Sequence, residues 1–80
     1  MLGQDRVTSP LTTEQIKDGI GIDDLKVRLG DTGEYYWATL SRRHDGHHYV
    51  RSKRVPNDAT QDDLDRIREA FEAWWEDERG

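Results

Sequence analysis

The twenty residues from Tyr35 to Arg54 constrain the fold of this chain more than any other stretch. They read YYWATLSRRHDGHHYVRSKR, which is two runs of strand-favouring residues on either side of Asp45 and Gly46. An Asp-Gly pair between two such runs is a strong local signal for a β-hairpin. The stretch therefore predicts two antiparallel strands joined by a tight turn.

The length of this turn decides which side chains share a face, because successive residues of a strand point to opposite sides. A two-residue Asp-Gly turn would pair Ser41 with Val50 and would mix apolar and basic residues on both faces. A three-residue turn, His44 to Gly46 with the glycine as a bulge, would instead pair Ser41 with Tyr49. The three-residue register separates apolar from basic side chains, so it is the register that we predict.

In the predicted register one face of the sheet is apolar and the other is basic and aromatic. A third strand is expected at residues 25–29, where LKVRL alternates apolar and basic residues before a Gly-rich turn. The apolar face is expected to carry Leu25, Val27, Leu29, Tyr36, Ala38, Leu40 and Val50. The other face would carry Tyr35, Thr39 and a candidate nucleic-acid site of Lys26, Arg28, Trp37, Arg43, Tyr49, Arg51 and Lys53.

Two helices are expected to flank the strands. The longer helix begins after Thr60, an N-cap residue, and carries an apolar stripe at spacings of three and four: Leu64, Ile67, Phe71 and Trp74. The shorter helix is capped either by Ser9, with Pro10 at its first position, or by Thr12 with Gln15 completing a capping box. Residues 55–59, VPNDA, are expected to stop the sheet, because Pro56 cannot continue a central ladder.

The predicted fold class is therefore α+β, in the order α-β-β-β-α. A short N-terminal helix precedes a three-stranded antiparallel sheet, and a long C-terminal helix packs on one sheet face. With 80 residues the chain is long enough for one small domain. We expect that domain at residues 9–80, preceded by a flexible arm at residues 1–8. Whether the first helix covers the outer side of the sheet is left open by the sequence.

The net charge of −5 is unevenly distributed along the chain. The 20 residues from Tyr35 to Arg54 hold five basic residues and one acidic residue, whereas Val55 to Gly80 holds three basic and nine acidic residues. A negative protein repels nucleic acid at long range, but a local positive face still acts within a Debye length of roughly 8 Å. The location of the charge therefore matters more than its total.

Several classes of function receive no support from the sequence. There is no cysteine, so neither disulfides nor thiolate metal sites are possible. A fold without disulfides suits a reducing compartment, and we therefore expect a cytoplasmic location. No signal peptide or membrane-spanning stretch is recognisable, so no membrane partner is expected. His44, His47 and His48 cluster near the turn, but adjacent strand residues diverge, so no metal site is predicted. No catalytic motif is present, and we predict neither an enzyme nor a cofactor.

The stretch from Gly33 to Trp75 resembles the N-terminal arm-site DNA-binding domain of tyrosine recombinases, the phage-type integrases. The matching positions are Trp37 with Ala38, Asp45 with Gly46, Arg51 to Arg54, and the helix from Thr60. The resemblance implies a three-stranded sheet that is inserted into the major groove of DNA. Basic residues would then contact phosphates or base edges, and aromatic residues would pack beside them. The leading expectation is a non-enzymatic DNA-binding module, either a monomer or a small homo-oligomer.

An alternative function rests on the acidic back of the long helix. This surface would bind a protein complex, as small regulators or inhibitors encoded by phages and other mobile elements do, for example anti-defence proteins. Its candidate residues are Asp65, Glu69, Glu72, Trp75 and Glu76. Trp75 adjoins Trp74, which is expected to point inward, and an exposed tryptophan often anchors an interface. The sequence thus leaves two binding surfaces, one basic and one acidic.

Overall fold

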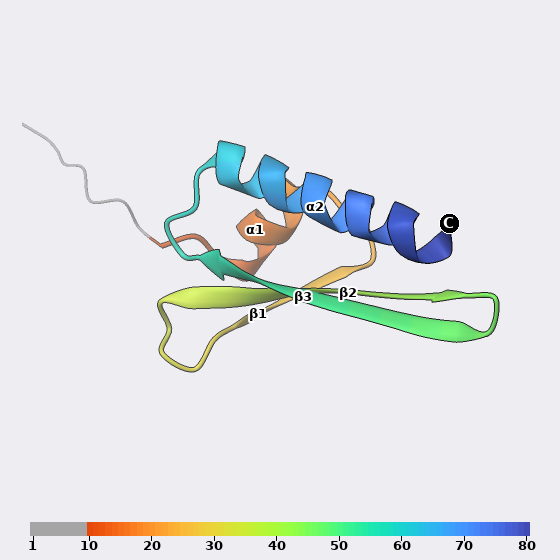
Figure 1. The fold of residues 1–80 in the computed structure, drawn as a ribbon. Helices are drawn as coiled ribbons and strands as arrows, with labels where there is room; N and C mark the ends of the chain where they lie inside the picture. Colours follow the sequence, from red (N-terminus) through yellow and green to blue (C-terminus); the bar gives the residue numbers. More distant parts are fainter. Residues whose placement is uncertain (1–9) are drawn as a thin grey trace, which may run out of the picture.

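A computed structural model describes residues 10–80 and confirms the α+β fold class (Figure 1). The order of elements is α1 (Thr13–Ile20), β1 (Leu25–Leu29), β2 (Tyr35–His44), β3 (His47–Pro56) and α2 (Gln61–Arg79). The arm expected at residues 1–8 lies outside the described residues.

Both helices begin at the capping signals that the sequence provides. The Thr12 hydroxyl accepts a hydrogen bond from the Gln15 amide, and the Gln15 side chain accepts one from the Thr12 amide, which completes a capping box. Thr60 and Asp63 form the same reciprocal pair at the start of α2. Gly21 ends α1 with a φ of 78°, a conformation that glycine adopts without strain. Local chemistry therefore fixes the helix boundaries.

The three strands form one antiparallel sheet in the order β1-β2-β3. Both helices lie on the same side of this sheet, with α1 between α2 and the strands in the view of Figure 1. α1 contacts β1 and α2, and α2 contacts β3. We call the covered side the helix side and the opposite side the outer face. The first helix thus leaves the outer face open, which settles a point that the sequence left undecided.

The core lies between the helices and the helix side of the sheet. Phe71 of α2 and Ile16 of α1 are fully buried there against Leu40 of β2. Burying each of these side chains contributes roughly 1.5–3 kcal/mol, and this burial holds α1 and α2 against the sheet. The Tyr36 hydroxyl, at the edge of this core, donates a hydrogen bond to the Leu11 carbonyl and is thereby satisfied.

The predicted register of the second hairpin is wrong. The structure has the two-residue turn: His44 pairs with His47, and Ser41 pairs with Val50 rather than with Tyr49. Asp45 and Gly46 both have positive φ, 54° and 77°, as in a type I′ turn. The backbone twist of this turn matches the right-handed twist of the strands, which is why it is preferred in hairpins.

The three-residue register follows only if each face of the hairpin is uniformly apolar or basic along its whole length. The helices impose no such demand, because the core reaches only one residue of β3, Val55. Val50, expected in the core, instead lies on the outer face and is 55% exposed, and Leu29 at the end of β1 is 52% exposed. The long side chains of Arg51 and Lys53 start on the helix side of an edge strand, where such chains can reach water.

Candidate nucleic-acid interface

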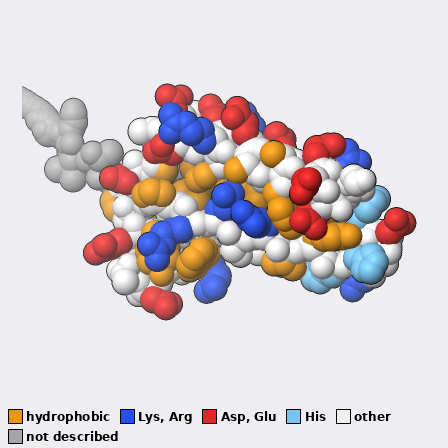
Figure 2. Space-filling model, in the orientation of Figure 1, with side chains coloured by type: hydrophobic (Ala, Val, Ile, Leu, Met, Phe, Trp, Pro, Cys, Tyr) orange, Lys and Arg blue, Asp and Glu red, His pale blue; other side chains and the backbone are white. Residues whose placement is uncertain are grey.

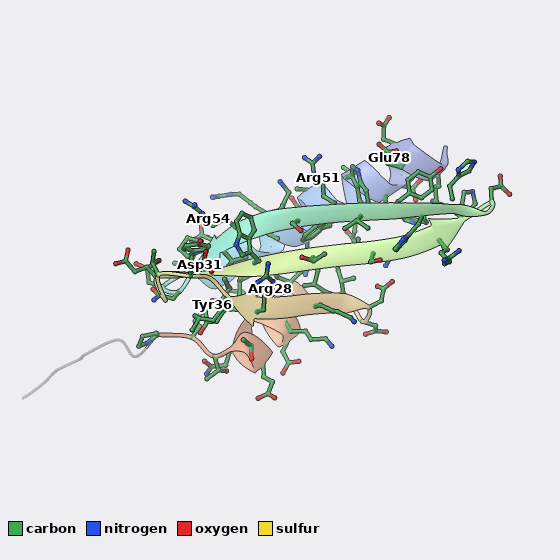
Figure 3. The ribbon with its side chains drawn as sticks, turned by 90° about the horizontal axis from the view of Figure 1, so that it is seen from below. Arg28, Asp31, Tyr36, Arg51, Arg54 and Glu78 are labelled. Atoms are coloured by element: carbon green, nitrogen blue, oxygen red, sulfur yellow. The ribbon has the colours of Figure 1, made fainter. Side chains whose placement is uncertain are left out.

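The outer face of the sheet is defined by the pairing of alternate residues. Trp37 stands opposite Arg28 of β1 and opposite Arg54 of β3, so these three side chains form one row across the sheet. The next row contains Lys26, Thr39 and Ser52. The complete outer face consists of Lys26, Arg28, Tyr35, Trp37, Thr39, Ser41, Arg43, His48, Val50, Ser52, Arg54 and Pro56. Figure 3 views this side, with Arg28 in front of the sheet.

The structure brings together only part of the site that the sequence predicts. Lys26, Arg28, Trp37 and Arg43 lie on the outer face as expected, whereas Tyr49, Arg51 and Lys53 belong to the helix side. In their place the outer face has His48, Ser52 and Arg54. The two-residue Asp-Gly turn was the signal that would have identified Arg54, because a change of one residue in turn length moves all of β3 to the other side.

Arg54 is held beside two aromatic rings at one end of the outer face. Its guanidinium carbon lies 4.4 Å from the ring centroid of Tyr35 and 5.9 Å from that of Trp37. The two rings are 5.7 Å apart and nearly perpendicular, with an interplanar angle of 89°. Cation–π and edge-to-face contacts of this kind limit the motion of the side chains involved. Arg54, Tyr35 and Trp37 are therefore partly preorganised.

The middle of the outer face is uncharged and rich in hydroxyl groups. Thr39 and Ser52 share a hydrogen bond of 2.9 Å across β2 and β3, and Ser41 is hydrogen-bonded to His48. An open groove of about 540 Å³ runs past Thr39, Ser41 and Val50 towards Lys26. The acidic residues that line this groove, Asp23 and Asp24, precede β1. Hydroxyl and basic groups thus line the same surface.

The charges of the sheet and of α2 have opposite signs. No strand residue between positions 25 and 56 is an aspartate or glutamate, and four basic residues lie on the outer face: Lys26, Arg28, Arg43 and Arg54. Acidic side chains instead gather along α2, at the top of the molecule in Figure 2, on the other side of the sheet. The negative net charge of the protein therefore resides largely away from the outer face.

One basic side chain on the helix side is neutralised by an ion pair. Arg42 donates two hydrogen bonds to the Asp24 carboxylate, at 2.9 and 3.0 Å. The hydrogen bond from Arg42 lowers the pKa of Asp24 below its ordinary value, and the same bond raises the pKa of Arg42. The pair ties β2 to the turn that precedes β1.

Trp75, the proposed anchor of the alternative protein-binding surface, packs against the hairpin. Its ring centroid lies 5.7 Å from that of Tyr49 and 5.9 Å from that of His44, and the Arg42 guanidinium is 5.3 Å away. β2 supplies Arg42 and His44 to this contact, and β3 supplies Tyr49. Trp75 closes the helix side of the hairpin where the aliphatic core ends, which accounts for its presence without a partner.

The acidic residues of the alternative surface are dispersed along α2. Asp65 pairs with Arg68 at 3.4 Å and accepts a hydrogen bond from Gln61, and Glu76 is paired with Arg79. Glu69 and Glu72 are exposed. A groove of about 430 Å³ lies between α2 and β2, lined by Glu72 and Glu76 together with Trp75 and Leu40. Of the acidic residues predicted for this surface, Glu72 and Glu76 lie together at this groove, whereas Asp65 and Glu69 do not line it.

The histidines at the hairpin end are divided between the two faces. His44 and His47 are directly paired on the helix side, near Trp75 and Tyr49, and His48 lies on the outer face. Residues 10–80 contain no group of three or more His, Cys, Asp or Glu side chains placed to hold a metal ion. Within the same residues, neither helix has the length and apolar character required to cross a membrane.

Comparison with known proteins yields no relative: no family model, no curated protein and no solved structure matches the chain. The resemblance to the arm-site domain of tyrosine recombinases therefore stays a prediction. The features available for a functional argument are those of the molecule itself, a three-stranded sheet with two helices on one side and a basic, aromatic outer face.

Proposed function

We propose that this protein is a non-enzymatic module that binds nucleic acid through the outer face of its sheet. The observation that carries the proposal is the grouping of four basic side chains with Tyr35 and Trp37 on a sheet face that neither helix of residues 10–80 covers. No acidic residue of the strands interrupts this face. The residues assigned to the interface are Lys26, Arg28, Trp37, Arg43 and Arg54.

Electrostatic and geometric arguments support this assignment. Lysine and arginine neutralise phosphates and release counterions, which supplies most of the sequence-independent affinity for nucleic acid. The carboxylates of α2 lie on the opposite side of the sheet (Figure 2), and charges separated by more than a Debye length of roughly 8 Å are largely screened. The outer face can therefore attract a polyanion although the whole chain is negative.

The test is binding of fluorescein-labelled duplex DNA, followed by fluorescence anisotropy at salt concentrations between about 50 and 200 mM. If all four basic residues contact phosphates, the logarithm of the affinity should fall with the logarithm of salt concentration with a slope of about −3 to −4. Arg28→Ala and Arg54→Ala should each weaken binding and reduce the magnitude of this slope by about 1.

Matched controls separate the outer face from mere loss of positive charge. Arg51→Ala removes the same charge from the same strand, but on the helix side, and should leave the slope nearly unchanged. Arg66→Ala, on α2, serves as a second control, since its side chain is 76% exposed. No binding of the wild-type protein at low salt would refute the proposal. Equal effects of Arg54→Ala and Arg51→Ala would refute the assignment to the outer face.

A further inference from the structure

The row of Arg28, Trp37 and Arg54 places one aromatic side chain between two cations across the three strands. Trp37 is half-buried, so part of its ring faces solvent. The Arg54 guanidinium lies closer to Tyr35, at 4.4 Å, than to Trp37, at 5.9 Å, and therefore covers the phenol ring more closely than the indole. This arrangement presents an aromatic platform with a positive charge on either side.

Such a platform matches the needs of an unpaired nucleotide. A base of a single strand exposes its faces, and stacking on an aromatic side chain contributes roughly 1–3 kcal/mol per base. A base within a duplex already stacks on its neighbours, and inserting a side chain between them costs a few kcal/mol per step. Trp37 therefore adds binding energy for a single strand that it cannot add, without distortion, for a duplex.

The adjacent row of the outer face can accommodate a second nucleotide. Thr39 follows Trp37 on the same face, two residues and therefore about 6.6 Å further along β2. Thr39, Ser41 and Lys26 line the groove of about 540 Å³. Hydroxyl groups can donate to or accept from the edge of an unpaired base or a sugar hydroxyl, and the lysine can meet a phosphate. The surface next to Trp37 is thus polar, with hydroxyl groups along β2 and Lys26 on β1, while Asp23 and Asp24 line the far end of the groove before β1.

We infer that the outer face binds single-stranded polynucleotide in preference to duplex, with a base stacked on Trp37 and the flanking phosphates near Arg28 and Arg54. This inference rests on the proposed nucleic-acid function and names the form of nucleic acid that the site selects. DNA and RNA strands share the chemistry that it requires.

The test compares three labelled probes of one mixed sequence, about 12 nucleotides long, within the usual range of single-strand site sizes. These are the DNA strand, the corresponding RNA strand and the DNA duplex, each titrated with the full chain at low and at physiological salt. At least one of the two single strands should bind tenfold or more tightly than the duplex. The relative affinity of the DNA and RNA strands identifies the preferred sugar.

Variants of Trp37 test the stacking contact. Trp37→Leu keeps an apolar side chain and should weaken single-strand binding about 5- to 150-fold, the range that 1–3 kcal/mol implies, and should weaken duplex binding by a smaller factor. Trp37→Phe retains a ring and should restore part of the loss. Leu29→Ala, at an exposed apolar position on the helix side, is the control and should have little effect. Circular dichroism establishes that each variant is folded.

The outcomes distinguish this inference from the function on which it rests. Duplex binding as tight as single-strand binding would overturn the single-strand preference and leave nucleic-acid binding intact. Equal loss of duplex and single-strand affinity in Trp37→Leu would overturn the stacking role. Failure of all three probes to bind at low salt would overturn the proposed function itself.

Discussion

Trp75 provides the sharpest test of how the hairpin is held against α2. In the structure its ring packs on Tyr49 and His44 and lies under the Arg42 guanidinium. Trp75→Ala removes an aromatic pair worth about 0.5–1.5 kcal/mol and a cation–π contact worth about 0.5–1 kcal/mol, as well as part of the apolar area of a half-buried ring. We expect the free energy of unfolding to fall by about 2 to 3 kcal/mol, less than the 3–5 kcal/mol of a fully buried tryptophan.

The loss should be measured by urea denaturation followed by far-UV circular dichroism, because the chain has three tryptophans and its fluorescence is not specific to one. In a domain of this size it corresponds to a decrease in Tm of about 8–24 °C. Amide exchange at the hairpin end, residues 44–47, should accelerate more than exchange in α1. Trp75→Phe should recover part of the stability, and Glu69→Ala, at an exposed position of α2, should change it by less than about 0.5 kcal/mol. Wild-type stability of Trp75→Ala would refute the packing role and would favour an exposed protein-binding anchor instead.

Two further predictions concern the ion pair and the register. Because hydrogen bonding to Arg42 lowers the pKa of folded Asp24, ionised Asp24 stabilises the protein at pH values above its unfolded pKa of about 3.9, and this contribution disappears as pH falls through the lower folded pKa. Wild type should therefore be more stable than Asp24→Asn at neutral pH, by less than about 1 kcal/mol because the Asp24 side chain is 47% exposed. Urea denaturation near pH 2 should show a smaller difference in stability between the two proteins. A difference that does not change with pH would contradict the role of the ion pair. In the observed register Ser41 and Val50 form a non-hydrogen-bonded pair, whose Cα atoms are typically about 4.5 Å apart, so a strong nuclear Overhauser effect between their Hα protons is expected. A strong Hα contact between Arg42 and His48 in its place would indicate the three-residue turn, because that register makes these two residues a non-hydrogen-bonded pair.

Much of the fold was predictable from the sequence, because the signals involved are local. Thr12 and Thr60 start helices by bonding to amides three residues away, and Gly21 ends a helix through its own backbone freedom. The alternation in LKVRL and the apolar spacing along α2 likewise need no knowledge of distant residues. These signals determined the order and type of all five elements. They also located most of the cations of the outer face.

The candidate site was predictable only in part, because the faces of β3 depend on what covers them. The assignment of Tyr49, Arg51 and Lys53 to the outer face assumed an apolar core along the whole hairpin, whereas the core ends near Val55 and Leu40. Beyond that point a single tryptophan from α2 covers the helix side. The sequence pattern carried no information on how far the helices extend over the strands.

By itself, then, the sequence determined the order and type of five elements and a hairpin at Asp45 and Gly46. Tertiary structure decided that the turn has two residues, that both helices occupy one side of the sheet, and that Arg54 joins Arg28 and Trp37 on the other. The physical reason is that a strand offers both of its faces equally until other elements bury one of them. Capping and periodicity act within a few residues, whereas the choice of face is made by packing between elements far apart in the chain.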